Sequence, residues 1–243
     1  MMSIDSAVRW SEILLGIAVM QQSLEHLALH PRDRALFASR LVLAAMLSFA
    51  VAPLVMEAAL LVTGLLVLRR FDGPYNGGSD RMTLLLLVCL LASHLAPTPR
   101  WRELVLGYAA VQVVLSYAIA GWVKLREPSW RSGEALRDVF AWSSYPVSAQ
   151  VRRWAPGPRA SRILSWGIVS FESLFPLALL DAGALRVALV AAVGFHFANA
   201  VLLGLNRFLW VWIAAYPLLL WFHTRFFAHA DAGTLPRAMV ALS

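Results

Sequence analysis

Charged residues are scarce in this chain. Only 14% of its 243 residues are Asp, Glu, Lys or Arg, whereas a soluble domain carries about 25%. Hydrophobic residues make up 60% of the sequence, and the mean hydropathy is +0.67. This shortage of charge excludes an ordinary soluble domain and predicts an integral membrane protein.

Lysine is almost absent. Lys124 is the single lysine beside twenty arginines. Both residues can anchor a helix end at a membrane surface, but only lysine loses its proton readily when it is desolvated. Lys124 follows the uncharged run 104–123. Two interpretations stay open for this lysine, a snorkelling anchor and a catalytic base.

Cysteine and clustered metal ligands are also missing. Cys89 is the only cysteine, so no internal disulfide can form. Histidines and carboxylates are scattered singly, without the spacing of a metal site, and we predict no metal. The arginines lie mainly between apolar segments, which favours anionic lipid headgroups over nucleic acid as the partner. The expected surroundings are therefore a lipid bilayer.

Apolar runs close to the ~20 residues needed to cross a bilayer dominate the chain. We predict an all-α, polytopic transmembrane bundle of seven to eight spans, forming one domain over 1–243 without a soluble domain. A turn near Pro53 divides the long run 36–70 into two helices. The predicted helices are 8–28, 37–52, 54–70, 81–97, 103–125, 160–181, 184–204 and 206–222.

The longest polar stretch, 124–162, is predicted to contain a short interfacial helix at 133–142. Leu136, Val139 and Phe140 share one face of that helix, as in helices that lie along a membrane surface. The stretch is therefore predicted to follow the headgroup layer.

Two predicted spans carry polar residues near their middle, where each costs a few kcal/mol. Glu172 has nine uncharged residues before it and eight after it. Pro176 frees the Glu172 carbonyl from its helical hydrogen bond, which indicates a kink beside a polar cavity. His196 and Asn199 share a face of another span. Each of these residues is either functional or a structural hydrogen-bonding group.

Other polar residues fall near predicted helix ends. We interpret Glu57 and His94 as interfacial residues, with a functional role as the alternative. We also interpret the polar residues at the end of the first helix as a solvated, interfacial helix end. These residues are Gln21, Gln22, Glu25 and His26.

Lys124 shares a helical face with Tyr117 and Gly121, which precede it by seven and three residues. Gly121 leaves space on that face for a close neighbour or for a ligand. This arrangement is the basis for treating the end of the helix as a candidate site.

The stretch YAIAGWVKLREPSWRSGEAL resembles the motif of the HTTM family, the membrane domain shared with vitamin K-dependent gamma-glutamyl carboxylase. Two further stretches are similar to the family, PYNGGSDRM at 74–82 and FHFANAVLLGLNRFLWVWIAAYPLL at 195–219. The resemblance covers roughly 10–222. The positions that carry it are Tyr117, Ala120, Gly121, Lys124, Leu125, Trp130, Gly133, His196, Asn199, Phe208 and Pro217.

The resemblance implies a membrane enzyme that uses a quinone or hydroquinone. In the carboxylase, a lysine amine deprotonates vitamin K hydroquinone, and the product then drives proton abstraction from a peptide glutamate. The resemblance implies that Lys124 is the base, and we predict Lys124, His196 and Glu172 as the catalytic residues. The implied cofactor pocket contains Tyr117, Gly121, Trp122 and Asn199. The implied substrate or loop motif contains Asn76, Asp80 and Trp130.

The short architecture also resembles bacterial HTTM subunits that help to mature a secreted toxin. This resemblance implies a location in a bacterial inner (plasma) membrane. The second functional hypothesis is therefore an accessory subunit that acts with a soluble partner on a peptide, without redox chemistry of its own. In the first hypothesis, carboxylase-like or epoxidase-like enzyme chemistry belongs to this chain, and the substrate is a peptide or a small molecule.

Overall fold

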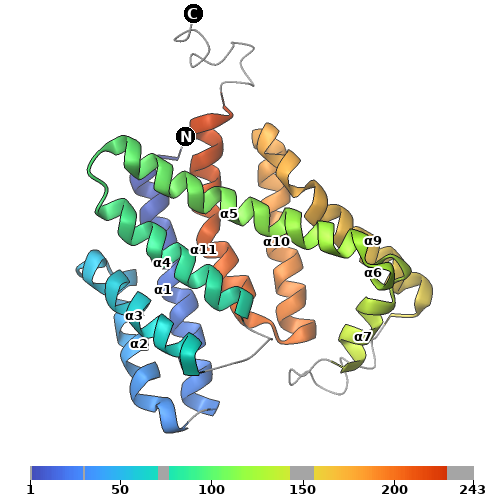
Figure 1. The fold of residues 1–243 in the computed structure, drawn as a ribbon, viewed down its shortest axis with the longest axis horizontal. Coiled ribbons are helices and arrows are strands. Elements are labelled where there is room, and N and C mark those ends of the chain that lie inside the picture. Colours follow the sequence, from blue (N-terminus) through green and yellow to red (C-terminus); the bar gives the residue numbers. More distant parts are fainter. Residues whose placement is uncertain (1, 30, 71–76, 143–155, 229–243) are drawn as a thin grey trace, which may run out of the picture. The chain divides into compact units, whose positions relative to one another are not determined.

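The computed structural model describes residues 2–29, 31–70, 77–142 and 156–228, which form helices joined by short connections (Figure 1). The prediction of an all-α protein is confirmed over these residues. The α-helices are α1 (Ile4–Leu29), α2 (Arg34–Ser48), α3 (Pro53–Arg70), α4 (Gly77–His94), α5 (Pro99–Arg126), α6 (Pro128–Ser132), α7 (Glu134–Trp142), α9 (Pro158–Leu174), α10 (Ala182–Leu203) and α11 (Asn206–Phe226). Two 3₁₀ helices are η1 (Pro31–Asp33) and η2 (Phe175–Leu180).

The helix boundaries follow residues that start or stop helices. Pro53 begins α3, as predicted, after a turn in which Ala50 and Ala52 have φ angles of 60° and 42°. Proline is tolerated there because the first N–H groups of a helix have no intrahelical partner. The Asp181 side chain caps α10 by accepting a 2.6 Å hydrogen bond from the Ala184 N–H.

Three helical segments of the described chain are long and apolar enough to cross a membrane: Pro99–Arg126, Pro158–Leu180 and Ala182–Leu203. The predicted count of seven to eight spans is not supported. The reason lies in length and charge, since α2 has only 15 residues and α4, which begins at Gly77, carries Asp80 and Arg81 near its start. Helix positions were therefore predicted better than the number of helices that can span.

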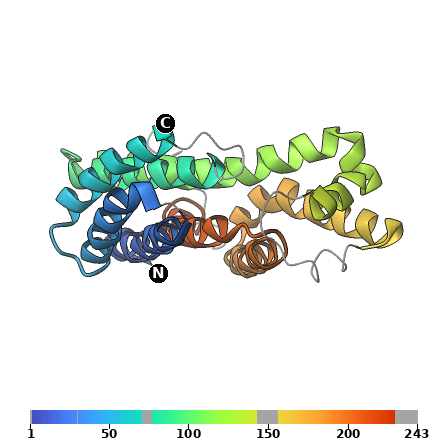
Figure 2. The ribbon, with the colours of Figure 1, turned by 90° about the horizontal axis from the view of Figure 1, so that it is seen from below.

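The helices form two compact units. Unit 1 contains Met1–Val111 and Arg207–Phe222, and unit 2 contains Gln112–Asn206 and His223–Ser243. In unit 1, α1 lies along α2, and α3 contacts both α2 and α4, as Figures 1 and 2 show. Leucines fill the space between these helices. The fully buried ones include Leu15, Leu47, Leu60, Leu86 and Leu90.

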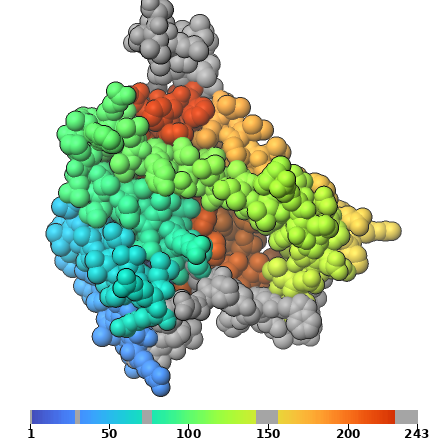
Figure 3. Space-filling view, in the orientation of Figure 1, coloured from blue at the N-terminus to red at the C-terminus, as the bar shows by residue number. Residues whose placement is uncertain are grey.

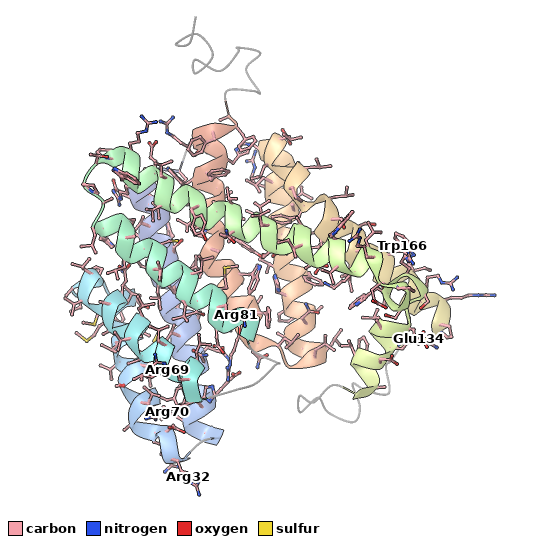
Figure 4. The ribbon with its side chains drawn as sticks, viewed as in Figure 1. Arg32, Arg69, Arg70, Arg81, Glu134 and Trp166 are labelled. Atoms are coloured by element: carbon pink, nitrogen blue, oxygen red, sulfur yellow. The ribbon has the colours of Figure 1, made fainter. Side chains whose placement is uncertain are left out.

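One end of unit 1 is basic. Arg32, Arg69 and Arg70 lie together near the start of α2 and the end of α3 (Figure 4), and all three are exposed. Arg70 pairs with Asp33 at 2.7 Å. The contact of these arginines with anionic lipid headgroups stays a prediction.

In unit 2, the short helices α6 and α7 pack against α9 (Figures 1 and 2). Gly133 joins them with a φ of 81°, and a Cβ at this position would lie 2.5 Å from the Arg162 backbone nitrogen. Helix α7 matches the short helix predicted at 133–142. Its Leu136 is buried, whereas Glu134 on another face is exposed.

Unit 2 exposes large apolar side chains on its candidate spans. Val187 and Val190 of α10 are 70% and 73% exposed. On α5, Leu115, Ile119 and Trp122 are also exposed, and this helix lies open on the face seen in Figure 3. Exposed apolar stripes on long uncharged helices are the surfaces that hydrocarbon covers in membrane proteins.

Candidate functional site

Lys124 and Glu172 form an ion pair between two candidate spans. Lys124 lies in the last turn of α5, and its Nζ is 2.6 Å and 2.9 Å from the two carboxylate oxygens of Glu172 on α9. The Glu172 side chain is only 5% exposed and that of Lys124 19%. The Lys124 ammonium also lies 5.2 Å from the centre of the Trp130 ring, within cation–π range. The unique lysine is thus held by the carboxylate that the sequence singled out.

The backbone near Glu172 changes its helical form as Pro176 predicts. Helix α9 ends at Leu174, and η2 continues from Phe175 as a 3₁₀ helix. Because proline cannot donate a backbone hydrogen bond and its ring crowds the preceding turn, it disfavours regular α-helix at this position. The change in form falls within one turn of Glu172, so the carboxylate stands at the end of regular α-helix.

Gly121 allows α5 and α9 to approach each other closely. A Cβ on Gly121 would lie 2.5 Å from the Ser173 backbone nitrogen and 2.9 Å from the Glu172 carbonyl carbon. Of the two occupants that the sequence left open for this space, the structure contains the close neighbour. Gly121 therefore positions Glu172 opposite Lys124, and the backbone of α9 covers its free face.

A second polar pair lies further along α5. The Tyr117 hydroxyl is 2.8 Å from Nε2 of His196 on α10, and both residues are buried. The Tyr117 ring stacks on Phe175 at 4.1 Å and meets Phe171 edge-on at 5.8 Å. Tyr117 and Lys124 are seven residues apart, or about 10 Å along the helix axis. An aromatic, hydrogen-bonded pair thus lies two turns from the amine and its carboxylate.

The remaining residues predicted for this site differ in their exposure, their contacts and the unit to which they belong. Asn199 is half-buried on α10, and Trp122 is 54% exposed with the Arg126 guanidinium 4.9 Å from its ring centre. Trp130 contacts Lys124, as described above. Asn76 lies outside the described residues. Asp80 belongs to unit 1, whereas the other described residues of the predicted site belong to unit 2.

Asp80 lies in a buried polar network of unit 1. Gln22 donates a 2.6 Å hydrogen bond to Asp80 and accepts a 3.2 Å bond from Arg40. Arg40 is only 1% exposed and also donates to the Thr63 hydroxyl at 3.0 Å. Burial raises the pKa of Asp80. Sequence analysis missed Arg40 because its place near the start of a predicted helix is typical of a surface arginine.

The end of α1 belongs to the same region of unit 1. Arg207 lies 2.6 Å from Nε2 of His26 and 3.4 Å from the Glu25 carboxylate. Gln22 and His26 are both 5% exposed. The interpretation of these two residues as a wet helix end was therefore wrong, because α2, α4 and α11 supply partners that cover them.

A third cluster joins three helices of unit 1. His94, the last residue of α4, lies 2.8 Å from Glu12 of α1 and 3.6 Å from Glu57 of α3. Glu57 is completely buried. Its interpretation as a residue of an exposed turn was wrong, because the Glu57 side chain is enclosed within unit 1 beside Glu12 and His94.

Long apolar helices with exposed apolar faces, two of them joined by the Lys124–Glu172 ion pair, are typical of a helical membrane protein. Residues 90–223, more than half of the chain, match the HTTM domain, so the chain belongs to the HTTM family of vitamin K-dependent carboxylase-like membrane domains. The matched residues include Lys124, Glu172 and His196. No curated protein and no solved structure matches the chain significantly.

Proposed function

We propose that this chain is a membrane enzyme in which Lys124, paired with Glu172, is the general base. The observation that carries the proposal is the short contact between the only lysine and a buried carboxylate, 2.6 Å long, in the last turn of a candidate span. An arginine could form the same ion pair, but it cannot supply a neutral base because its guanidinium stays protonated.

The pair can generate a base without a net change of charge. Transfer of one proton from the Lys124 ammonium to Glu172 leaves a neutral amine and a carboxylic acid. The amine then accepts a proton from a substrate hydroxyl and becomes an ammonium again, while the substrate becomes an oxyanion. The oxyanion then lies beside the newly formed Lys124 ammonium. The attraction between these two charges stabilises the oxyanion in a medium of low dielectric constant.

The cofactor that we propose for this base is a hydroquinone, as the family resemblance implies. Such a cofactor supplies two acidic hydroxyl groups and the reducing equivalents of its ring when it is bound. Two turns along α5, the Tyr117 hydroxyl and the His196 imidazole, which hydrogen-bond to each other, would supply polar contacts to its oxygens, and the Phe171 and Phe175 rings would supply apolar contacts to its ring. Gly121 acts by letting α9 approach, so we assign it to positioning Glu172 and not to cofactor contact.

The test compares Lys124→Arg and Lys124→Ala with the parent protein in lipid nanodiscs. The measured quantity is the rate of oxidation of a reduced naphthoquinone by oxygen. Loss of a general base typically lowers a rate by about 10²–10⁴-fold, and we expect a loss of that order in both variants. Added small amines should restore part of the rate in Lys124→Ala, because they can enter the space that the side chain leaves.

Arg131→Lys is the matched control, since it makes the reverse exchange at an exposed position of α6. It should keep the parental rate. Retention of full activity by Lys124→Arg would exclude the base and would favour an accessory subunit that helps a soluble partner to mature a peptide. Thermal unfolding of each variant separates a chemical loss from a loss of fold.

A further inference from the structure

Three potential metal ligands converge in unit 1, outside the site described above. One ligand atom from each of Glu12, Glu57 and His94 lies within 4.8 Å of the other two. They come from α1, α3 and the end of α4. Glu57 lies 45 positions after Glu12 and 37 positions before His94, so no local sequence motif identifies the cluster.

Glu57 is the most informative member of the cluster. The residue is 0% exposed, and neither carboxylate oxygen has a hydrogen-bond partner among the described residues. Nε2 of His94 lies 3.6 Å from this carboxylate, which is beyond hydrogen-bond distance. A buried carboxylate without hydrogen bonds is costly unless a cation compensates its charge. The carboxylate of Glu57 is thus directed at the two other ligands with both oxygens available.

The spacing of the three groups suits one ion. Two ligands that bind a metal at about 2.1 Å lie about 3.0–3.4 Å apart in octahedral or tetrahedral geometry. The observed distances from His94 Nε2, 2.8 Å to Glu12 and 3.6 Å to Glu57, lie on either side of this range. Small rotations of side chains would therefore create a three-ligand centre without moving the helices.

Arg9 holds Glu12 in the orientation that such a centre needs. Its guanidinium donates to Oε2 of Glu12 at 2.9 Å, while Oε1 of the same carboxylate faces His94. Arg9 is itself fixed to the end of α2 by a 3.0 Å hydrogen bond to the Leu47 carbonyl. Partners of this kind orient carboxylate ligands in metal sites and strengthen binding.

An access route reaches the cluster through His94. A cavity of about 440 Å³ is lined by His94, Ser93, Thr98, Arg102 and Glu103, together with apolar residues. The His94 side chain is 28% exposed. An ion can therefore arrive from this side, and the coordination positions left by three protein ligands can take water.

From this geometry we propose that Glu12, Glu57 and His94 bind one divalent transition-metal ion. Two carboxylates and an imidazole suit Zn²⁺, Mn²⁺ or Fe²⁺ and disfavour Mg²⁺, which prefers oxygen ligands alone. The proposal departs from the absence of metal predicted from the sequence, because helix packing, and not spacing, brings these ligands together. It is independent of the function proposed for Lys124.

The test uses the full-length protein, purified in nanodiscs without a polyhistidine tag and stripped with a chelator. Equilibrium dialysis against Zn²⁺, Mn²⁺ or Mg²⁺, followed by elemental analysis, should give one Zn²⁺ or Mn²⁺ per chain and no Mg²⁺. Glu57→Gln and His94→Gln should each weaken binding by at least about tenfold. With Co²⁺ as a spectroscopic probe, the parent should show ligand-field bands that both variants lose.

Glu134→Gln is the matched control, because it removes an exposed carboxylate of α7 and should bind the ion as the parent does. Lys124→Ala should also bind normally, which separates this proposal from the first. A parent that binds no Zn²⁺ or Mn²⁺, or a Glu57→Gln variant that binds with parental affinity, would overturn the proposed site.

Thermal unfolding distinguishes the metal site from a structural ion pair. A ligand that binds only the folded state raises Tm. Zn²⁺ should therefore raise the Tm of the parent by several degrees and leave the Tm of Glu57→Gln unchanged. If Glu57→Gln instead lowers Tm in chelator and Zn²⁺ does not change the parental Tm, the cluster is an ion pair and the proposal is wrong.

Discussion

A side chain at Gly121 would collide with the backbone of α9. The atoms nearest to a Cβ at this position belong to Ser173 and Glu172, and backbone atoms cannot rotate away as a flexible side chain can. The contact sets the separation of the two helices that carry Lys124 and Glu172. A residue without a functional group thereby controls the distance between two that have one.

We predict that Gly121→Ala destabilises the protein by about 1–3 kcal/mol, as overpacking does in tight interiors. The variant should also lower the activity that depends on Lys124, because α9 must shift. Gly167→Ala on α9 is the control, since a Cβ there meets nothing within 4 Å and alanine favours a helix by up to about 1 kcal/mol. Thermal unfolding in nanodiscs measures the stability of both variants. Equal Tm values for Gly121→Ala and Gly167→Ala would contradict the close contact at Gly121.

Several site residues could be recognised singly from the sequence, but their partners could not. Lys124 was conspicuous because it is unique, and Glu172 because it interrupts an uncharged run. Arg40 and Glu57 were not recognised, since each lies near a predicted helix end where charge is ordinary. The structure buries both. Burial depends on which helices pack around a residue, and that packing is not encoded in its immediate neighbours.

At the scale of elements, sequence patterns located the helices well. Proline, glycine and charged residues mark their ends, and the eight long predicted segments correspond to α1–α5, α9 with η2, α10 and α11. The amphipathic pattern also located α7. Local composition is sufficient here because the backbone hydrogen bonds of a helix form between residues close in sequence.

Helix α7 should depend on Leu136 for its docking. Leu136→Ala leaves a cavity and should cost about 2 kcal/mol or more, which makes local opening of α7 easier. Hydrogen exchange of the peptide covering 134–141 should then rise on the order of tenfold. Glu134→Ala, at an exposed position, should leave the exchange unchanged. Equal protection in the two variants would show that α7 does not dock through this residue.

At the scale of the whole molecule, three helical segments of the described chain meet the length and apolarity of membrane spans. The sequence analysis counted more spans, because it accepted short helices and helices with charged residues near their ends as spans. The exposed valines of α10 give a direct test of its surroundings. Val190 is 73% exposed and lies near the middle of the helix.

A fluorophore attached to Val190→Cys should be quenched strongly by lipids that carry a quencher on their acyl chains. The same label at Arg69→Cys, in the exposed basic end of unit 1, should be quenched weakly. Both variants are made in a Cys89→Ala background, which removes the single buried native thiol. Weak quenching at position 190 would place this face of α10 outside the hydrocarbon region.

The sequence by itself determined the class of protein, the position of its helices and the residues whose chemistry is unusual. These are properties of composition and local periodicity, so neighbouring residues suffice to specify them. Only the tertiary structure decided that Lys124 meets Glu172, 48 residues away, and that Glu12 meets His94, 82 residues away. Such contacts depend on how apolar faces pack between helices remote in the chain, and that packing produced both the proposed base and the proposed metal site.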